Sequence, residues 1–277
     1  MSPVASSLLA RVRPGAALGA AGRDLAAALA GWRVWWGLGL QDILIRYRRT
    51  LLGPLWISVS QAATFIFIGM LFSAVLKTDV RYYLPYLAVG LVTWGFLFGA
   101  AAEGPRVFLE AQHVINALRM PLLSHVLRVL ARHLLIYAHT LAVAVAAYLV
   151  LGGRLGPALL QLPLSLLLLG AVLFPVIVLL AVLGARFRDL GPVIEVLGQM
   201  VFFLTPIMWR PEDLPLASKW WVGINPVHHL LTLVRAPLFG EMLPRPSVLI
   251  ALGLAVGLNL AALGLFAACR RRIPYWL

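Results

Sequence analysis

The histidines and carboxylates of this sequence are the residues from which an enzyme or a metal site would be built. Of the six histidines, His228 and His229 are adjacent, so on a helix their rings point about 100° apart and make a poor chelate. His133 and His139 are six residues apart and share no helix face closely. The His-Glu-x-x-His and Gly-x-Ser-x-Gly patterns are absent. We predict no catalytic residue and no metal site in this chain.

Nucleotide binding would need a glycine-rich phosphate loop, and the sequence has none. Its only lysines are Lys77 and Lys219, and neither follows a glycine, as the lysine of a Gly-x-x-x-x-Gly-Lys-Ser/Thr loop must. The single cysteine, Cys269, excludes an intrachain disulfide and a cysteine-cluster metal site. We therefore expect no cofactor in this chain.

The residues with the clearest binding chemistry are three arginines, Arg46, Arg48 and Arg49. A guanidinium fits phosphate oxygens well, so the group can contact a lipid headgroup or a lipid diphosphate. The pair Gly53-Pro54 follows and starts a new helix, since proline is tolerated in a first turn. Basic residues beside a membrane span also set its orientation, which is the simpler explanation of the same cluster.

The elements that hold these residues must suit a very apolar chain. Of the 277 residues 62% are apolar and 12% are charged, and the mean hydropathy is +0.93. A soluble domain has about 45–50% apolar residues even with glycine counted. This composition excludes a soluble enzyme, a disordered chain and a fibrous repeat. It predicts an all-α, polytopic membrane protein.

Six stretches are long and apolar enough to span a bilayer as helices. The strands of a β-barrel would show alternating apolar and polar residues, and the sequence shows no such alternation. The fifth stretch is the weakest, because Glu195 interrupts it. The predicted spans are Leu55–Leu76, Tyr82–Ala102, His133–Leu151, Leu162–Ala185, Leu190–Trp209 and Pro246–Cys269.

The net charge of +13 is distributed unevenly about these spans. With a cytoplasmic N-terminus, sixteen of the 23 lysines and arginines fall on the inner side. This asymmetry follows the positive-inside rule and places both termini in the cytoplasm. We expect a multi-pass protein of the plasma membrane, either the inner membrane of a Gram-negative cell or the cell membrane of another bacterium. Nucleic acid is not an expected partner.

Three parts make up the predicted organisation of the chain. Residues 1–23 form a mobile cytoplasmic tail, residues 24–54 an amphipathic interfacial helix with a basic linker, and residues 55–277 the six-helix transmembrane domain. The helix over Asp24–Leu40 is predicted from apolar residues at steps of four, three, four and four, and its tryptophans suit the membrane interface. A short soluble helix packed on a partner is the alternative. The residues that set this pattern are Leu25, Leu29, Trp32, Trp36 and Leu40.

Between spans five and six lies an uncharged run, Trp220–Val234, that is too short to cross the membrane and is split by Asn225 and Pro226. Such a segment favours a re-entrant or interfacial hairpin whose broken backbone is shielded by protein.

Three ordered motifs resemble a known family. The run Arg46–Trp56 resembles the signature before the first span of ABC type-2 exporter permeases that move polysaccharides, such as O-antigen, capsule and teichoic acid. Arg186–Leu190 resembles the family's Arg-Asp element. Phe202–Met208, followed by Asn225-Pro226, is similar to its Ser-Pro-Ile and Asn-Pro elements, with Thr205 where serine is more usual. The resemblance covers the chain from about Asp24 to Leu277.

The resemblance implies a permease subunit of an ATP-driven exporter for a polysaccharide or lipid-linked glycan. It implies a homodimer with two copies of a separate nucleotide-binding subunit, which would hold ATP and Mg. Membrane lipid and the lipid-linked glycan are the other implied partners. An ABC type-2 exporter of a drug or lipid is the first alternative, although such exporters usually lack these motifs. A membrane-embedded glycosyl- or acyltransferase is the second.

A transporter of this kind needs cytoplasmic elements that contact its ATPase. In the loop 103–132, Val107, Glu110, Val114 and Leu118 have helical spacing, and the family carries a coupling helix here. Arg186 and Asp189 would form a second contact, or pair with each other at i, i+3. The loop could instead be solvated and serve only topology. The residues expected to couple are Glu110, His113, Asn116, Arg119, Arg186 and Asp189.

A passage for a glycan would combine aromatic platforms with weak polar contacts, because tight sites would trap the polymer. The aromatic residues near the predicted spans are candidates for this role, although each could equally pack between helices or anchor in lipid. They are Trp56, Phe65, Phe72, Trp94, Phe98, Phe203, Trp220 and Trp221.

Overall fold

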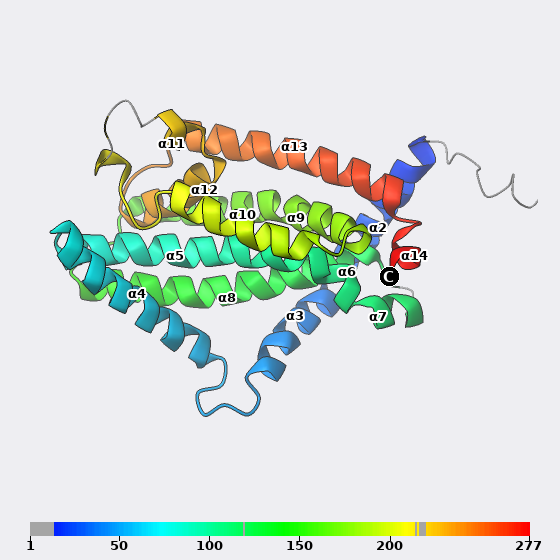
Figure 1. Cartoon of the computed structure of the whole chain (residues 1–277), viewed down its shortest axis with the longest axis horizontal. Helices are drawn as coiled ribbons and strands as arrows, with labels where there is room; N and C mark the ends of the chain where they lie inside the picture. The colour runs from blue at the N-terminus through cyan, green and yellow to red at the C-terminus, as the bar shows by residue number, and fades with distance from the viewer. Residues whose placement is uncertain (1–13, 119, 214, 216–219) are drawn as a thin grey trace, which may run out of the picture.

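Long helices run side by side along one axis of the molecule (Figure 1). The computed structural model describes residues 14–118, 120–213, 215 and 220–277, and all regular structure within them is helical. The long helices are α4 (Leu55–Leu76), α5 (Val80–Glu103), α8 (Leu122–Val150), α9 (Leu162–Arg186) and α13 (Arg245–Cys269). The shorter ones are α2 (Pro14–Ala30), α3 (Trp32–Arg46), η1 (Gly104–Arg106), α6 (Val107–Glu110), α7 (Gln112–Ala117), η2 (Pro157–Gln161), α10 (Leu190–Leu204), η3 (Pro211–Asp213), α11 (Trp220–Ile224), α12 (Pro226–Leu238) and α14 (Ile273–Trp276).

Among the described residues, five helical segments are long and apolar enough to cross a membrane. The predicted span Leu55–Leu76 coincides with α4, and Leu162–Ala185 ends one residue before α9 does. The fifth predicted span corresponds to α10, which has 15 residues and is therefore about 22 Å long. The hydrocarbon core of a bilayer is roughly 30 Å thick. The all-α class is confirmed, and helix length supports five spans, with α10 as a shorter apolar helix.

Helix α10 ends at Leu204, whereas the sequence predicted a span to Trp209. The reason is local. Pro206 has no N–H to donate and disfavours helical backbone at the preceding residue. Thr205 is accordingly extended, with φ −98° and ψ 138°. The last part of the predicted span is therefore irregular backbone.

Helix α8 begins at Leu122, eleven residues before the span predicted from His133. Arg128 and Arg132, assigned from the sequence to a cytoplasmic loop, lie inside this helix. Because two charged residues lower the hydropathy of this stretch, hydropathy alone did not predict that it belongs to the helix. The structure places carboxylates beside both arginines, and these ion pairs allow the helix to continue.

The N-terminal region is more helical than predicted. Residues 1–13 lie outside the described part of the chain, but residues 14–23 belong to α2 rather than to a tail, and Ala21 is fully buried. The helix expected over Asp24–Leu40 is divided at Gly31 between α2 and α3. Alanine has the highest helix propensity, which accounts for the helical start. The three-part division of the chain stays a prediction.

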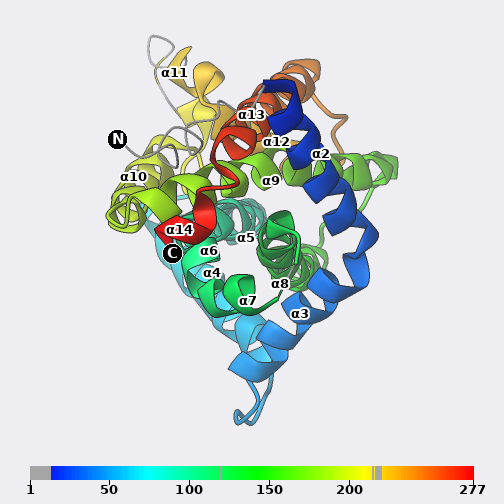
Figure 2. The same ribbon diagram turned by 90° about the vertical axis from the view of Figure 1, so that its right-hand side faces the viewer.

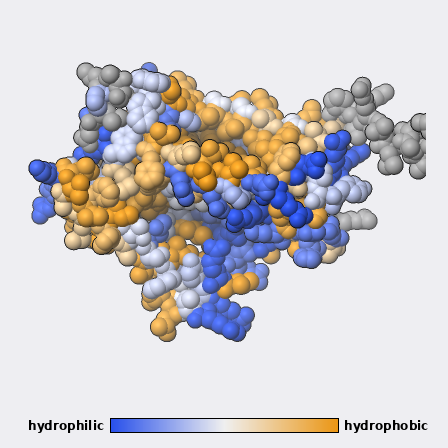
Figure 3. Space-filling model, in the orientation of Figure 1, coloured by the Kyte–Doolittle hydropathy of each residue, from blue (hydrophilic) through white to orange (hydrophobic). Residues whose placement is uncertain are grey.

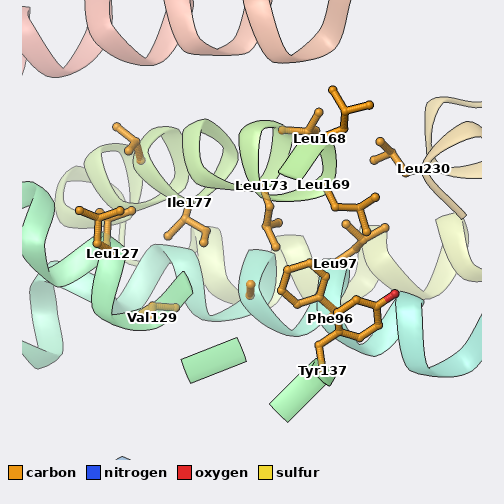
Figure 4. Close-up of a cluster of buried hydrophobic side chains, with 14 of the residues drawn as sticks. Phe96, Leu97, Leu127, Val129, Tyr137, Leu168, Leu169, Leu173, Ile177 and Leu230 are labelled. Carbon is orange, nitrogen blue, oxygen red and sulfur yellow. The ribbon is translucent and has the colours of Figure 1, made fainter. Parts of the chain in front are cut away.

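Helix α5 forms the centre of the bundle and contacts α4, α8, α9, α10 and α12. The view along the bundle shows it enclosed by these helices (Figure 2). Phe96 of α5 stacks on Tyr137 of α8, with ring centroids 4.6 Å apart. Leu169, Leu173 and other aliphatic side chains of α9 pack over this pair (Figure 4). The core is therefore shared by α5, α8 and α9.

Apolar side chains cover much of the outside of the bundle (Figure 3). Hydrophilic residues gather on the turn between α3 and α4 and toward the end that carries α7. Phe67 on α4 is 72% exposed, and Leu249 on α13 is 67% exposed. A water-facing surface would not carry such residues over its length, so this is a multi-pass membrane protein.

Candidate functional site

The irregular segment after α10 is held by side chains from other helices. The hydroxyl of Tyr83 donates to the carbonyl of Met208 at 2.6 Å. The hydroxyl of Tyr86 lies 3.1 Å from the carbonyl oxygen of Pro206. Backbone polar groups at membrane depth must be bonded within the protein. These tyrosines of α5 therefore allow α10 to end early, inside an apolar stretch.

Arg235 of α12 completes this arrangement, which we call the carbonyl latch (the carbonyls of 206–209 with Tyr83, Tyr86 and Arg235). Its Nη1 donates to the Pro206 carbonyl at 2.6 Å, and its Nη2 donates to the carbonyls of Ile207 at 3.1 Å and Tyr86 at 3.2 Å. Arg235 is 7% exposed. Gly90 of α5 makes the room, because a Cβ there would lie 2.1 Å from Nη2.

The segment that the sequence predicted as a hairpin consists of two short helices, α11 and α12, that meet at Asn225. The Asn225 side chain caps α12 by accepting from the N–H of Val227 at 2.9 Å, as asparagine does at helix starts. Pro226 occupies the first turn. The amide of Asn225 also donates to Thr205 Oγ1 at 3.0 Å. The break between the two helices is therefore tied to the end of α10.

An aromatic cluster lies between α5 and α10. Trp94 stacks on Phe98 with ring centroids 5.2 Å apart. Phe202 packs edge-on against Trp94 at 5.7 Å and against Phe203 at 5.3 Å. Three of the aromatic residues predicted to line a passage thus meet, and Phe202, which the prediction omitted, joins them. Phe203 is 72% exposed, so the cluster reaches the surface.

The other predicted passage residues lie apart from this cluster. Phe65 is 1% exposed and packs in the core, so it offers no face to a passage. Phe72 is half-buried on α4, whereas Trp56 on the same helix is 49% exposed. Trp220 is 68% exposed. The ring centroids of Trp221 and Trp209 lie 5.7 Å apart, and the two rings are tilted by 30°.

The predicted coupling loop is helical but broken. Helices α6 and α7 follow α5, with a turn at Ala111 between them. Glu110, His113 and Asn116 are all exposed, and Arg119 lies outside the described residues. None of the residues of α7 is buried, and Gln112 bonds the main-chain oxygen of Leu277 at 2.6 Å. This end of the bundle presents a polar surface anchored to the C-terminal segment.

The second predicted contact, Arg186 and Asp189, forms no ion pair between its two members within the described side chains. Both are exposed. The Arg186 guanidinium lies over the Trp276 ring at 6.0 Å. Nearby, Arg106 donates to Glu195 at 2.9 Å, so the carboxylate that interrupts the fifth apolar stretch is paired.

The basic cluster lies where α3 ends and turns toward α4. Arg46 is the last residue of α3, and Arg48 and Arg49 occupy the turn that follows. All three are exposed, and within the described residues none pairs with a carboxylate. Gly53 takes a left-handed φ of +56° in this turn, a conformation that favours glycine.

Helix α3 is fixed to the bundle by an ion network that the sequence analysis missed. Asp42 of α3 accepts from Arg128 Nε at 2.8 Å and from Arg132 Nη1 at 2.9 Å. Arg132 also bonds Glu103 of α5, and His133 lies 2.9 Å from the same carboxylate. Helices α3, α8 and α5 thus share one network, because Arg132 touches a carboxylate on each neighbour.

A second carboxylate fixes α2. Asp24 accepts from the N–H groups of Leu122 at 3.3 Å and Leu123 at 3.1 Å, and from Arg270 at 2.8 Å. These two N–H groups begin α8, whose own N-cap position is a proline without a capping side chain. Asp24 therefore caps α8 from another helix. A lone acidic residue in an alanine-rich stretch was the available sequence signal.

Comparison with known proteins agrees with this architecture. The chain is 25% identical over 245 residues to the O-antigen export system permease protein RfbA of Myxococcus xanthus. The aligned residues make up 83% of this chain and 90% of that protein. It is 25% identical over 195 residues to the protein of the same name from Klebsiella pneumoniae, covering 69% and 74%. The sequence profile of the ABC-2 type transporter family matches residues 33–239. The family expected from the three motifs is confirmed: this chain belongs to the ABC-2 type transporters.

Proposed function

We propose that this chain is the permease subunit of an ATP-driven exporter that moves a polysaccharide or a lipid-linked glycan across the plasma membrane. The observation that carries the proposal is the likeness, over 83% of the chain, to a protein named as an O-antigen export permease. The aromatic cluster that reaches the surface between α5 and α10 supports it, since sugar rings bind aromatic faces.

The membrane topology of the proposal has six crossings and cytoplasmic termini. Helix α10 with the irregular segment 205–209 makes the fifth crossing, because the carbonyl latch satisfies its backbone. Helices α11 and α12 form the re-entrant hairpin, and the burial of most of α12 supports this role. Helix α3 lies in the interface, with Leu44 and Ile45 exposed on its outer side.

Two copies of the chain are proposed to enclose the passage. Helices α4 and α10 both pack on α5 and carry large exposed apolar residues. Met70 on α4 is 59% exposed, and Met200 on α10 is 56% exposed. A second copy against this face would place the aromatic cluster beside the passage rather than in lipid.

A separate nucleotide-binding subunit, present in two copies with ATP and Mg, supplies the energy in this proposal. The exposed Glu110, His113 and Asn116 on α6 and α7 form the contact that we infer for it. Arg186 and Asp189 lie in the neighbouring exposed turn and would add a second contact. Arg46, Arg48 and Arg49 would bind the lipid diphosphate end of the glycan.

The test is reconstitution of this chain in vesicles with an ABC nucleotide-binding subunit from the same genome. We expect ATP-dependent movement of lipid-linked glycan, measured by its accessibility to an added glycosidase. Glu110→Lys should reduce co-purification of the ATPase, whereas the exposed Glu241→Lys at the opposite end should not. Transport of a drug or phospholipid without the glycan would favour the alternative exporter, and glycan modification by the chain alone would overturn the proposal.

A further inference from the structure

A cavity of about 580 Å³ opens at the end of the bundle where α5 begins, opposite α7 and the C-terminus (Figure 1). Its volume lies within the roughly 300–1,000 Å³ typical of small-molecule sites. The walls come from the start of α5, the end of α8 with the loop after it, and the loop after α10. The polar lining residues are Arg81, Arg154, Arg210, Tyr82, Tyr86 and Tyr148.

The three arginines carry positive charge that the described part of the chain does not balance. Their side chains form no ion pair and donate no hydrogen bond among the described residues, and Nε of Arg210 is buried without a partner. Arg235 lies behind the cavity wall, with its guanidinium 3.7 Å from the Tyr86 ring. Arg210 lies 5.4 Å from the same ring. An anion in the cavity would be stabilised by all these charges.

The described acidic side chains nearest the cavity form no ion pair with its arginines. Glu212 follows Arg210 by two residues, yet it pairs with no described arginine within 4 Å. Asp79 accepts from the main-chain N–H of Arg81 at 2.9 Å and leaves the Arg81 guanidinium unpaired. Of the described residues, three arginines and no acidic residue line the cavity.

The aromatic wall is held in place before any ligand arrives. The Tyr148 ring packs edge-on against Phe239 at 5.3 Å, and its hydroxyl donates to the carbonyl of Arg154 at 3.3 Å. Gly153 lies against this ring, because a Cβ there would be 2.2 Å from it. A rigid wall lowers the entropy lost on binding.

We propose that this cavity binds a phosphate-bearing group. Several guanidiniums match the charge and oxygens of a phosphate or diphosphate better than those of a single carboxylate. The tyrosines would contact the sugar or glycerol attached to it. The phosphate can belong to an anionic phospholipid or to the diphosphate end of a glycan lipid. The second case rests on the proposed function, and there the site holds the headgroup on the outer side after transport.

The experiment measures calorimetric binding of two probes to the purified full chain in detergent at low salt. The probes are inorganic pyrophosphate and dioctanoyl phosphatidylglycerol, with dioctanoylglycerol as the uncharged control. The variant is Arg81→Gln/Arg154→Gln, because both side chains are exposed and form no ion pair among the described residues. Arg245→Gln, an exposed arginine at the start of α13 that does not line the cavity, is its matched control.

We expect saturable binding that the double variant weakens by about tenfold or more and the control leaves unchanged. Binding of pyrophosphate without the lipid assigns the site to a diphosphate end. Binding of the lipid that pyrophosphate does not displace assigns it to a phospholipid headgroup. No saturable binding of either probe, or equal weakening in Arg245→Gln, overturns the proposal. Since neither ATP nor export is involved, that failure is separate from a failure of the proposed function.

Discussion

Gly90→Ala tests whether the carbonyl latch stabilises the half of the bundle in which α5 begins. The new methyl carbon would lie 2.1 Å from Nη2 of Arg235 and 3.2 Å from the Ile207 carbonyl oxygen. The guanidinium must then move and lose the two bonds that Nη2 donates, to Tyr86 and Ile207. Hydrogen bonds to a charged group contribute about 1.5–3 kcal/mol each. Replacing glycine by alanine within a helix stabilises the helix by about 1 kcal/mol. The expected net loss of stability is therefore about 2–5 kcal/mol.

Thermal unfolding of the purified chain in detergent, followed by tryptophan fluorescence, measures this effect. A loss of 1 kcal/mol lowers the Tm by about 2–4 °C in chains of comparable size, so Gly90→Ala should unfold at least about 4 °C lower. Gly95→Ala on the same helix is the control, because the nearest atom to its Cβ would be 3.7 Å away. That variant should be as stable as the parent chain or more stable.

A double-mutant cycle separates the clash from any general effect on α5. In an Arg235→Met background the side chain has no Nη2 for the methyl group to displace. Gly90→Ala should then cost at least about 1 kcal/mol less than it does in the parent chain. Equal costs in the two backgrounds, or a Gly90→Ala chain as stable as Gly95→Ala, would refute the role of the latch.

Three further changes give distinct outcomes. Replacing the arginines of 46–49 with glutamine should lower glycan export about tenfold, equivalent to 1.4 kcal/mol of headgroup affinity, while ATPase association and hydrolysis persist; normal export would exclude headgroup capture. Asp24→Ala removes a buried carboxylate from its arginine and from two N–H groups, so we expect about 3–5 kcal/mol lower stability. The exposed Glu241→Ala should change neither the Tm nor expression. Gly198→Ala would place a Cβ 1.8 Å from the Phe98 ring and should cost about 1–3 kcal/mol by overpacking, whereas Gly253→Ala has open space and should cost nothing.

The sequence predicts the apolar helices well because lipid imposes one strong rule on them. An uncharged run of sufficient length must be a helix, and α4 begins and ends at the predicted residues. The prediction fails where charge and helix coexist. Arg128 and Arg132 suggested a loop, and only the three-dimensional position of Asp42 on α3 shows why α8 contains them.

The same limit applies to the candidate site. Asn225 and Pro226 could be identified as a break between two helices, because their effects on the backbone are local. The carbonyl latch could not, because it joins Tyr86 to Arg235 across 149 positions of the chain. No spacing rule links residues at such a separation, and the glycine at position 90 has no periodic pattern that marks it.

Polar side-chain contacts hold helix α5 to its neighbours near both of its ends, and these contacts constrain how the bundle can move. Glu103, at its last turn, bonds Arg132 and His133 of α8. Tyr86, near its start, bonds the segment after α10 and contacts Arg235 of α12. Helices α6 and α7 follow the Glu103 end of α5 after the short helix η1. A force that reaches Glu103 would either tilt α5 together with α8 or break this part-buried ion pair. Losing one partner of a fully buried pair costs about 3–5 kcal/mol and an exposed pair contributes about 0–1 kcal/mol. The part-buried Arg132–Glu103 pair lies between these limits, so a tilt of α5 and α8 that keeps the pair intact is the less costly response.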